Sequence, residues 1–343
     1  MPSAESTWGY QMHKDTVLEG NAGAPATQTD SLPLRERIKP LIPLRFPGFE
    51  QHYIHGKRIL AFGFEPLDCR EWHSEMVNRI LNAVGQRIHF PLYRMGDGEY
   101  AFAIRRAEDK LPLGRLRPRQ LAKRLIMPFL GRSGYHKSGS VEYGYEVYTS
   151  AERNVLQARY VECVQKVARD GILALGLHNT EIYLRYIPAI FDWFDANGIM
   201  LHHLNYFHVY SVYVLMHGPD RHRFLKGRHV LVVTGLTDEK RHGIESGLLR
   251  EGVADVQFLP ISRSKAMLDV LDLSVVRKPI DLALVGAGVG SANVLEQLRP
   301  LQTVCLDVGF CLSTLANPDL RWKRPFCVPD EEFDLSRAVQ FLE

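Results

Sequence analysis

The alternation of short apolar runs with helical patterns is the feature that most constrains the fold of this chain. Seven runs rich in Val, Leu and Ile show no strict alternation with polar residues, which is typical of strands covered on both faces. They span residues 88–95, 171–178, 199–207, 229–235, 255–262, 281–288 and 303–309. Strands that alternate with helices predict βαβ units, and so a Rossmann-like, mostly parallel α/β sheet with helices on both faces.

The segments between these runs predict the helices and the boundaries of the domain. Apolar residues at helical spacing predict helices near residues 70–86, 98–108, 118–130, 150–169, 180–196, 208–217, 237–250, 263–276 and 290–299. Residues 1–45 are rich in Ser, Thr, Ala, Gly and Pro, so we expect a flexible N-terminal segment there. A single Rossmann-like domain is expected over residues 46–343. Residues 131–150 are rich in Gly, Ser and Tyr and predict a long loop that could cover a ligand.

Charge and cysteine content exclude several classes of protein. A formal net charge of +3 on 343 residues provides no strong basic field, so we expect no nucleic-acid partner. The five cysteines form no CxxC pair, which indicates reduced thiols in a cytoplasmic protein. No stretch of about 20 residues is apolar enough to span a membrane, although peripheral association stays open. The chain has neither a G-x-S-x-G serine-hydrolase turn nor a GxxxxGK[ST] phosphate loop.

Polar and ionisable side chains are concentrated where the predicted strands end. Open α/β sheets bind ligands outside the carboxyl ends of their strands. These ends read RMGDGE, LHNTE, VTGLTDEKR, PISRSK, GAGVGS and DVGF, which is more charge than turns alone require. His178 and Asn179 are therefore candidates for a ligand site, with the alternative that Asn179 caps the next helix. Other histidines lack metal-ligand spacing and are expected in the core or on the surface, namely His202, His203, His208 and His217.

The segment RMGDGEYAF contains the sharpest candidate for a metal site. Asp97 and Glu99 are separated by one glycine, and carboxylates at this spacing can bind one hard cation such as Mn²⁺ or Mg²⁺. The glycines Gly96 and Gly98 leave room for a bulky ligand, and Arg94 can contact a phosphate or hold a carboxylate in place. The alternative is an ordinary turn, with Glu99 in the first turn of a helix where the helix dipole favours an acid.

The segment GAGVGSAN, residues 286–293, suggests a different use of the same fold. Gly286 and Gly288 follow a predicted strand, and Asp307 lies about 20 residues further on, as the ribose-binding acid of a dinucleotide site does. The third glycine has the wrong offset, and little chain follows. A Rossmann oxidoreductase or methyltransferase is thus an alternative, beside a glycine-rich turn that lines some other pocket.

Three segments resemble the GT-D-type glycosyltransferases and occur in the same order as in that family. FPLYRMGDGEYAF resembles the family's R-x-G-D-G-E element. HVLVVTGLTDEKRHGIESGLL resembles its strand, glycine turn and basic helix start, and DLALVGAGVGSANVLEQLRPLQTVCLDVGF resembles its C-terminal unit. The resemblance spans about residues 75–315. It implies a Rossmann-like fold that binds a nucleotide-diphosphate sugar, with a divalent cation, commonly Mn²⁺, at Asp97 and Glu99; Arg94 and Gly96 match the leading motif positions.

The resemblance predicts a metal-dependent glycosyltransferase that moves a sugar from a nucleotide-diphosphate sugar to a glycan, lipid-linked or protein acceptor. Breaking the sugar–phosphate bond requires stabilisation of the departing diphosphate, by the cation and by nearby basic residues. The residues expected to bind the donor are Arg94, Gly96, Gly98, Arg105, Asn179, Thr234, Gly235, Lys240, Arg241, Gly286 and Gly288.

A catalytic base would be needed if the reaction inverts the sugar's configuration. Asp307 and His178 are the candidates for it, with Glu239 as a further one. Thr234 and Phe310 depart from the family's pattern, which leaves open a non-catalytic module that binds a nucleotide sugar.

Overall fold

A seven-stranded parallel sheet forms the centre of the protein. The computed structural model describes residues 32–44, 59–64, 69–108, 148–178, 183, 186–218, 220–277 and 279–317. The strands are β3 (Phe90–Met95), β4 (Ile172–Leu175), β5 (Tyr206–His208), β6 (His229–Thr234), β7 (Asp255–Pro260), β8 (Leu282–Gly286) and β9 (Val304–Asp307). Their order is β5-β4-β3-β9-β8-β6-β7, and every pair is parallel. The predicted fold class is confirmed, and six of the predicted strands lie where they were expected, whereas the strand predicted over residues 199–207 overlaps β5 only at residues 206 and 207.

The strand order creates a switch point between β3 and β9. From β3 the chain proceeds outward through β4 to the edge strand β5. It then crosses to β6 in the other half of the sheet, forms the opposite edge with β7, and returns through β8 to β9. Neighbouring strands at such a point send their following loops to opposite faces, which opens a crevice at their carboxyl ends. A ligand site is therefore expected where β3 and β9 end.

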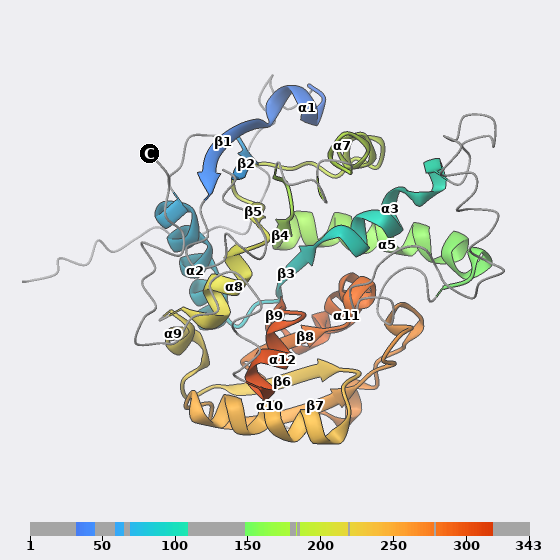
Figure 1. Cartoon of the computed structure of the whole chain (residues 1–343). Coiled ribbons are helices and arrows are strands. Elements are labelled where there is room, and N and C mark those ends of the chain that lie inside the picture. The colour runs from blue at the N-terminus through green and yellow to red at the C-terminus, as the bar shows by residue number, and fades with distance from the viewer. Residues whose placement is uncertain are drawn as a thin grey trace, which may run out of the picture. The chain divides into compact units, whose positions relative to one another are not determined.

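Helices pack on both faces of the sheet, as Figure 1 shows. On one side α5 (Ser150–Asp170) and α11 (Ser291–Gln297) contact each other and β3. On the other side α2 (Cys69–Gln86) contacts β9 and α9 (Arg221–Leu225), which in turn contacts α8 (Ser211–His217). Also present are α3 (Asp97–Glu108), α7 (Ile187–Ala196), α10 (Asp238–Arg250) and α12 (Cys311–Ala316). No helix in the described part of the chain is both long and apolar enough to cross a membrane.

A small antiparallel sheet lies at the end of β4. It pairs β1 (Lys39–Leu44) with β2 (Ile59–Gly63), after the short helix α1 (Leu34–Arg37). The backbone N–H of Phe62 donates to the carbonyl of Leu177 at 3.0 Å, and Ala61 forms a bridge with His178. Residues 34–44 of the predicted flexible segment thus form regular elements that adjoin the main sheet. Residues 1–31 lie outside the described residues.

The helix predicted over residues 263–276 is wrong. That segment forms two short 3-10 turns, η5 (Ala266–Leu268) and η6 (Leu273–Val275). Asp269 accepts hydrogen bonds from the backbone N–H and the hydroxyl of Ser262, and Asp272 accepts the corresponding pair from Ser274. Short polar side chains that bond to nearby backbone compete with helix formation. The helix predicted at 118–130 and most of the loop predicted at 131–150 fall outside the described residues.

Candidate functional site

Three strand ends lie level with one another on the β3 side of the switch point. Met95 of β3 is in register with Leu175 of β4, which is in register with His208 of β5. The backbone N–H of Gly176 donates to the carbonyl of Met95 at 3.1 Å, which continues the pairing past the strands. The polar residues that follow β3, β4 and β5 therefore begin at the same edge of the sheet.

Arg94 joins the ends of β3 and β9. Its backbone N–H donates to Oδ2 of Asp307 at 3.3 Å. A Cβ atom on Gly309 would lie 2.5 Å from an Nη atom of Arg94, so the guanidinium lies directly against the backbone after β9. Gly309 also has φ +47°, a conformation that side chains disfavour. Glycine at this position therefore allows the arginine to approach.

One guanidinium faces two buried carboxyl groups at this site. Glu99 is 6% exposed and Asp307 is 1% exposed. Burial raises the pKa of Asp307 to about 7, although Arg94 lowers it, and burial likewise raises the pKa of Glu99. Burial by itself lowers the pKa of Arg94. The electrostatic effect of Tyr213, Asp307 and Glu99 is larger and raises this pKa above its usual value, so the guanidinium stays charged. Ionising both acids would leave a surplus negative charge, which a proton or a bound cation can compensate.

The D-x-E pair lies on the first turn of helix α3. Glu99 Oε2 accepts the backbone N–H of Gly96 at 2.8 Å, so one of its oxygens caps the helix, as the turn interpretation expects. Asp97 is partly exposed at the first helical position. No three His, Cys, Asp or Glu side chains in the described ranges lie close enough to hold a metal ion. A cation at Asp97 and Glu99 would thus take its remaining oxygens from a ligand and water, as Mg²⁺ commonly does.

His178 lies within a group of buried rings beside this cluster. Its Nδ1 is 3.1 Å from Nε2 of His208, and its ring centroid is 4.4 Å from that of Tyr183. Tyr183 in turn reaches the D-x-E turn, since a Cβ on Gly96 would lie 3.5 Å from its hydroxyl oxygen. Burial lowers the pKa of His178 to about 3 and holds that of His208 well below its usual value. His208 was expected in the core or on the surface, and it is buried.

The candidates on β6, β8 and α10 form a separate group. Thr234 pairs with Gly286 across β6 and β8, and its hydroxyl accepts the backbone N–H of Leu236 at 3.3 Å. Lys240 is exposed, as is Glu239, and Arg241 pairs with Asp238 at 2.5 Å. Since β9 lies between β3 and β8, and β6 follows β8, the candidates on β8 and β6 lie two and three strands away from Arg94 on β3.

The glycines of this second group have packing roles within the chain. A Cβ on Gly235 would lie 2.5 Å from Cα of Arg263, and one on Gly286 would lie 2.6 Å from Leu312. Gly288 has φ +54°, and Gly98 has no atom within 4 Å of its Cβ position. Of the glycines predicted to face a ligand, Gly98 therefore has the clearest open space. Asn179 and the side chain of Arg105 lie outside the described residues.

Two tyrosines at the site were not predicted from the sequence. Tyr183 packs so closely on Gly176 that a Cβ there would lie 2.2 Å from the ring. Tyr213 of α8 adds to the charge environment of Arg94. No spacing rule marks a tyrosine that approaches from a later helix. Gly176 in the strand-end sequence LGLH was the available sign of such a tyrosine, since a glycine at a strand end often marks the close approach of another group.

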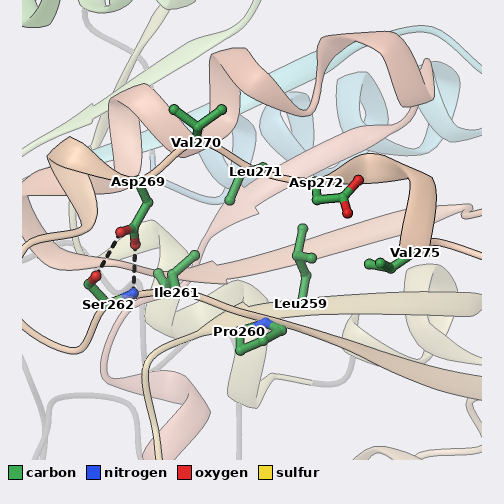
Figure 2. A pocket seen from close by; sticks show the side chains of 9 residues that line it. All are labelled: Leu259, Pro260, Ile261, Ser262, Asp269, Val270, Leu271, Asp272 and Val275. Carbon is green, nitrogen blue, oxygen red and sulfur yellow. Dashed lines mark hydrogen bonds between the residues drawn. The ribbon is translucent and has the colours of Figure 1, made fainter.

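A pocket of about 560 Å³ lies elsewhere, at the end of β7 (Figure 2). It is lined by Leu259, Pro260, Ile261, Ser262, Asp269, Val270, Leu271, Asp272 and Val275. In Figure 2 Asp269 turns to Ser262, and a second acid, Asp272, lies on the far side among apolar side chains. A diphosphate needs cations or N–H donors, which this lining lacks. We therefore do not assign the donor site to it.

The fold and the polar cluster at its switch point define an α/β protein of the Rossmann-like class. Residues 149–315 match the family model of the GT-D fold-like domain. The chain therefore carries a GT-D-like domain. The matched range begins after Arg94, Asp97 and Glu99, so their resemblance to the family motif stays a prediction. No curated protein has a significant match to the chain.

The chain also has weak similarity to solved structures. One is a glycosyltransferase (DUF1792) from Streptococcus sanguinis, with 15% identity, a TM-score of 0.39, and coverage of 68% of this chain and 80% of that one. Another is the domain of unknown function 1792, reported to have a distinct glycosyltransferase fold, with 13% identity, a TM-score of 0.38, and coverage of 70% and 81%. At these identities and TM-scores we draw no conclusion from the similarity.

Proposed function

We propose that this protein is a metal-dependent glycosyltransferase that moves a sugar from a nucleotide-diphosphate sugar to a glycan, lipid-linked or protein acceptor. The observation that carries the proposal is the cluster of Arg94, Glu99 and Asp307 at the β3/β9 switch point of a chain with a GT-D-like domain. Two buried acids share one arginine there, beside the partly exposed Asp97. This surplus of carboxylate suits a site for a divalent cation and a diphosphate.

Each residue of the cluster has a separate role in the proposal. Asp97 and Glu99 would hold the cation, which when bound supplies Lewis-acid stabilisation of the departing diphosphate. Arg94 holds Asp307 and Glu99 in place and adds positive charge at the same edge. Asp307 is the candidate base, because a carboxyl group with a pKa of about 7 can accept a proton near neutral pH.

The dinucleotide alternative has less support from the geometry. Asp307, which would bind the ribose, is buried against Arg94 instead. A Cβ on Gly290, the last glycine of GAGVG, would lie 2.6 Å from Ala266, so this glycine is needed where the turn packs on η5. Tight binding of NAD or S-adenosylmethionine that survives Asp97→Ala would favour the alternative.

The test is hydrolysis of a panel of nucleotide-diphosphate sugars with Mn²⁺ or with EDTA. Wild type should release free sugar in Mn²⁺, and Asp97→Ala and Glu99→Gln should lose at least about 100-fold, as expected when charge stabilisation of a leaving group is removed. Glu162→Gln, an exposed carboxylate of α5, is the matched control and should retain wild-type activity. Activity that survives both EDTA and Asp97→Ala would disprove the metal role. Failure to bind or hydrolyse any donor would disprove the transferase.

A further inference from the structure

The two buried histidines at the ends of β4 and β5 form a chain of hydrogen bonds with a defined direction. The backbone N–H of Tyr210 donates to Nδ1 of His208 at 3.2 Å, so this nitrogen carries a lone pair and no proton. A neutral imidazole has one N–H, which must then be at Nε2 of His208. Nε2 lies 3.1 Å from Nδ1 of His178 and donates to it.

The same reasoning places the proton of His178. Because its Nδ1 accepts from His208, its own N–H is at Nε2. Both rings are neutral at physiological pH, since burial lowers the pKa of each. Nε2 of His178 is buried and has no hydrogen-bond partner among the residues that the structure describes. Within the described part of the chain, the series of donors thus ends in a buried N–H without an acceptor.

An unpaired buried donor is unfavourable, and the great majority of buried polar groups in proteins have a partner. This one lies beside the proposed donor site. The His178 ring contacts Tyr183, whose hydroxyl reaches toward Gly96, and its centroid lies 5.5 Å from that of the Tyr210 ring. A neutral N–H among aromatic rings suits a sugar hydroxyl better than a phosphate, for which charged donors are preferred.

We propose that Nε2–H of His178 donates a hydrogen bond to a hydroxyl of the sugar carried by the nucleotide donor, and that His208 is the positioning residue that fixes this tautomer. The inference rests on the proposed function and deepens it. His178 is then a donor to the substrate and not the catalytic base, because its free nitrogen already carries a proton. His178 is fully buried, so contact with a sugar requires the side chains packed around its ring to shift.

The first experiment measures the tautomers directly. Long-range ¹H–¹⁵N spectra of ¹⁵N-histidine-labelled protein should show Nε2–H for both rings, with the signals assigned by their loss in His178→Gln and His208→Gln. The probes are UDP-glucose, UDP-galactose, UDP-N-acetylglucosamine and GDP-mannose, each with Mg²⁺, against UDP and GDP alone. A nucleotide sugar that binds should shift the His178 Nε2–H signal, and the sugar-free diphosphates should not.

The second experiment separates a hydrogen-bond donor from a base. His178→Gln retains an N–H donor but no basic nitrogen, whereas His178→Leu has neither. We expect kcat/KM for donor hydrolysis to fall about tenfold in His178→Leu, which is the size of one lost neutral hydrogen bond. In His178→Gln, which keeps a donor, it should fall no more than about threefold. His208→Gln can accept from Tyr210 and donate to His178, so it should preserve activity that His208→Leu loses. Thermal unfolding of each variant checks that it is folded.

The outcomes distinguish the two proposals. An Nδ1–H tautomer at His178, equal losses in His178→Gln and His178→Leu, or a response to UDP or GDP alone would overturn the inference and leave the transferase intact. A wild-type protein that binds none of the nucleotide sugars would overturn the proposed function, and the inference with it.

Discussion

At the scale of single residues, charge in the site is set by how deeply each group is buried. Asp307 and Glu99 are removed from water, and Arg94 is the cation beside them. Neither carboxyl group could be identified as buried from the sequence, because DVGF and DGE read equally well as exposed turns. The sequence could indicate which residues lie at strand ends, since apolar runs locate the strands. It could not indicate that Arg94 and Asp307 meet, because they are 213 residues apart.

Asp307 is expected to make stability depend on pH. Its pKa is about 7 in the folded protein against 3.8 for the ordinary group, so the folded state holds the proton that the unfolded state releases. The free energy of unfolding should therefore fall as pH rises from about 4 to about 7 and level off above that. Asp307→Asn should remove on the order of 2 kcal/mol of this decline between pH 5 and 7. Urea denaturation across that range measures it, and an unchanged slope would contradict the assignment.

Gly309→Ala should destabilise the protein through Arg94. The new methyl group would meet the guanidinium at 2.5 Å, on a backbone with φ +47°. We expect a loss of about 2 kcal/mol or more in the free energy of unfolding. The control is Gly98→Ala on α3, where nothing lies within 4 Å and stability should change by less than about 1 kcal/mol. Equal losses in both variants would show that Arg94 does not lie against Gly309.

At the scale of elements, apolar pattern predicted the sheet well and the irregular segments poorly. Six of the seven strands of the main sheet were predicted in place because strands buried on both faces form continuous Val/Leu/Ile runs, and β5 overlaps its predicted run only at residues 206 and 207. The segment after β7 has a helical pattern, but Asp269 and Asp272 turn back to nearby serines. Strands β1 and β2 were missed, since the prolines of KPLIPL argue against a strand in the middle of a sheet.

The packing of α10 on α12 provides a prediction at this scale. A Cβ on Gly247 of α10 would lie 2.4 Å from the carbonyl oxygen of Leu315, so the two helices approach through glycine. Gly247→Ala should lower the free energy of unfolding by about 1–3 kcal/mol through overpacking. Gly85→Ala near the end of α2 has no atom within 4 Å and should be neutral or add about 0.5–1 kcal/mol. A stabilising Gly247→Ala would show that the helices are further apart.

At the scale of the whole molecule, the proposed site draws on both halves of the sheet. Arg94 and Glu99 come from β3 and α3, and Asp307 comes from β9. Donor binding should therefore protect both halves, since a ligand stabilises the folded state by mass action. With Mg²⁺ and saturating nucleotide sugar, amide hydrogen exchange should slow in β4 as well as in β8. Asp97→Asn should abolish this protection, and protection confined to one half would place the ligand elsewhere.

The position of β9 has a consequence for how the protein is made. It is the last strand of the described sheet along the chain, yet it lies between β3 and β8. While a ribosome is still synthesising residues 304–307, the edges of β3 and β8 that later pair with it lack a partner, and unpaired edges invite aggregation. Joining strands so distant along the chain is also slow. The nascent protein is therefore expected to depend on chaperones until β9 inserts, and the proposed active site forms in that same step.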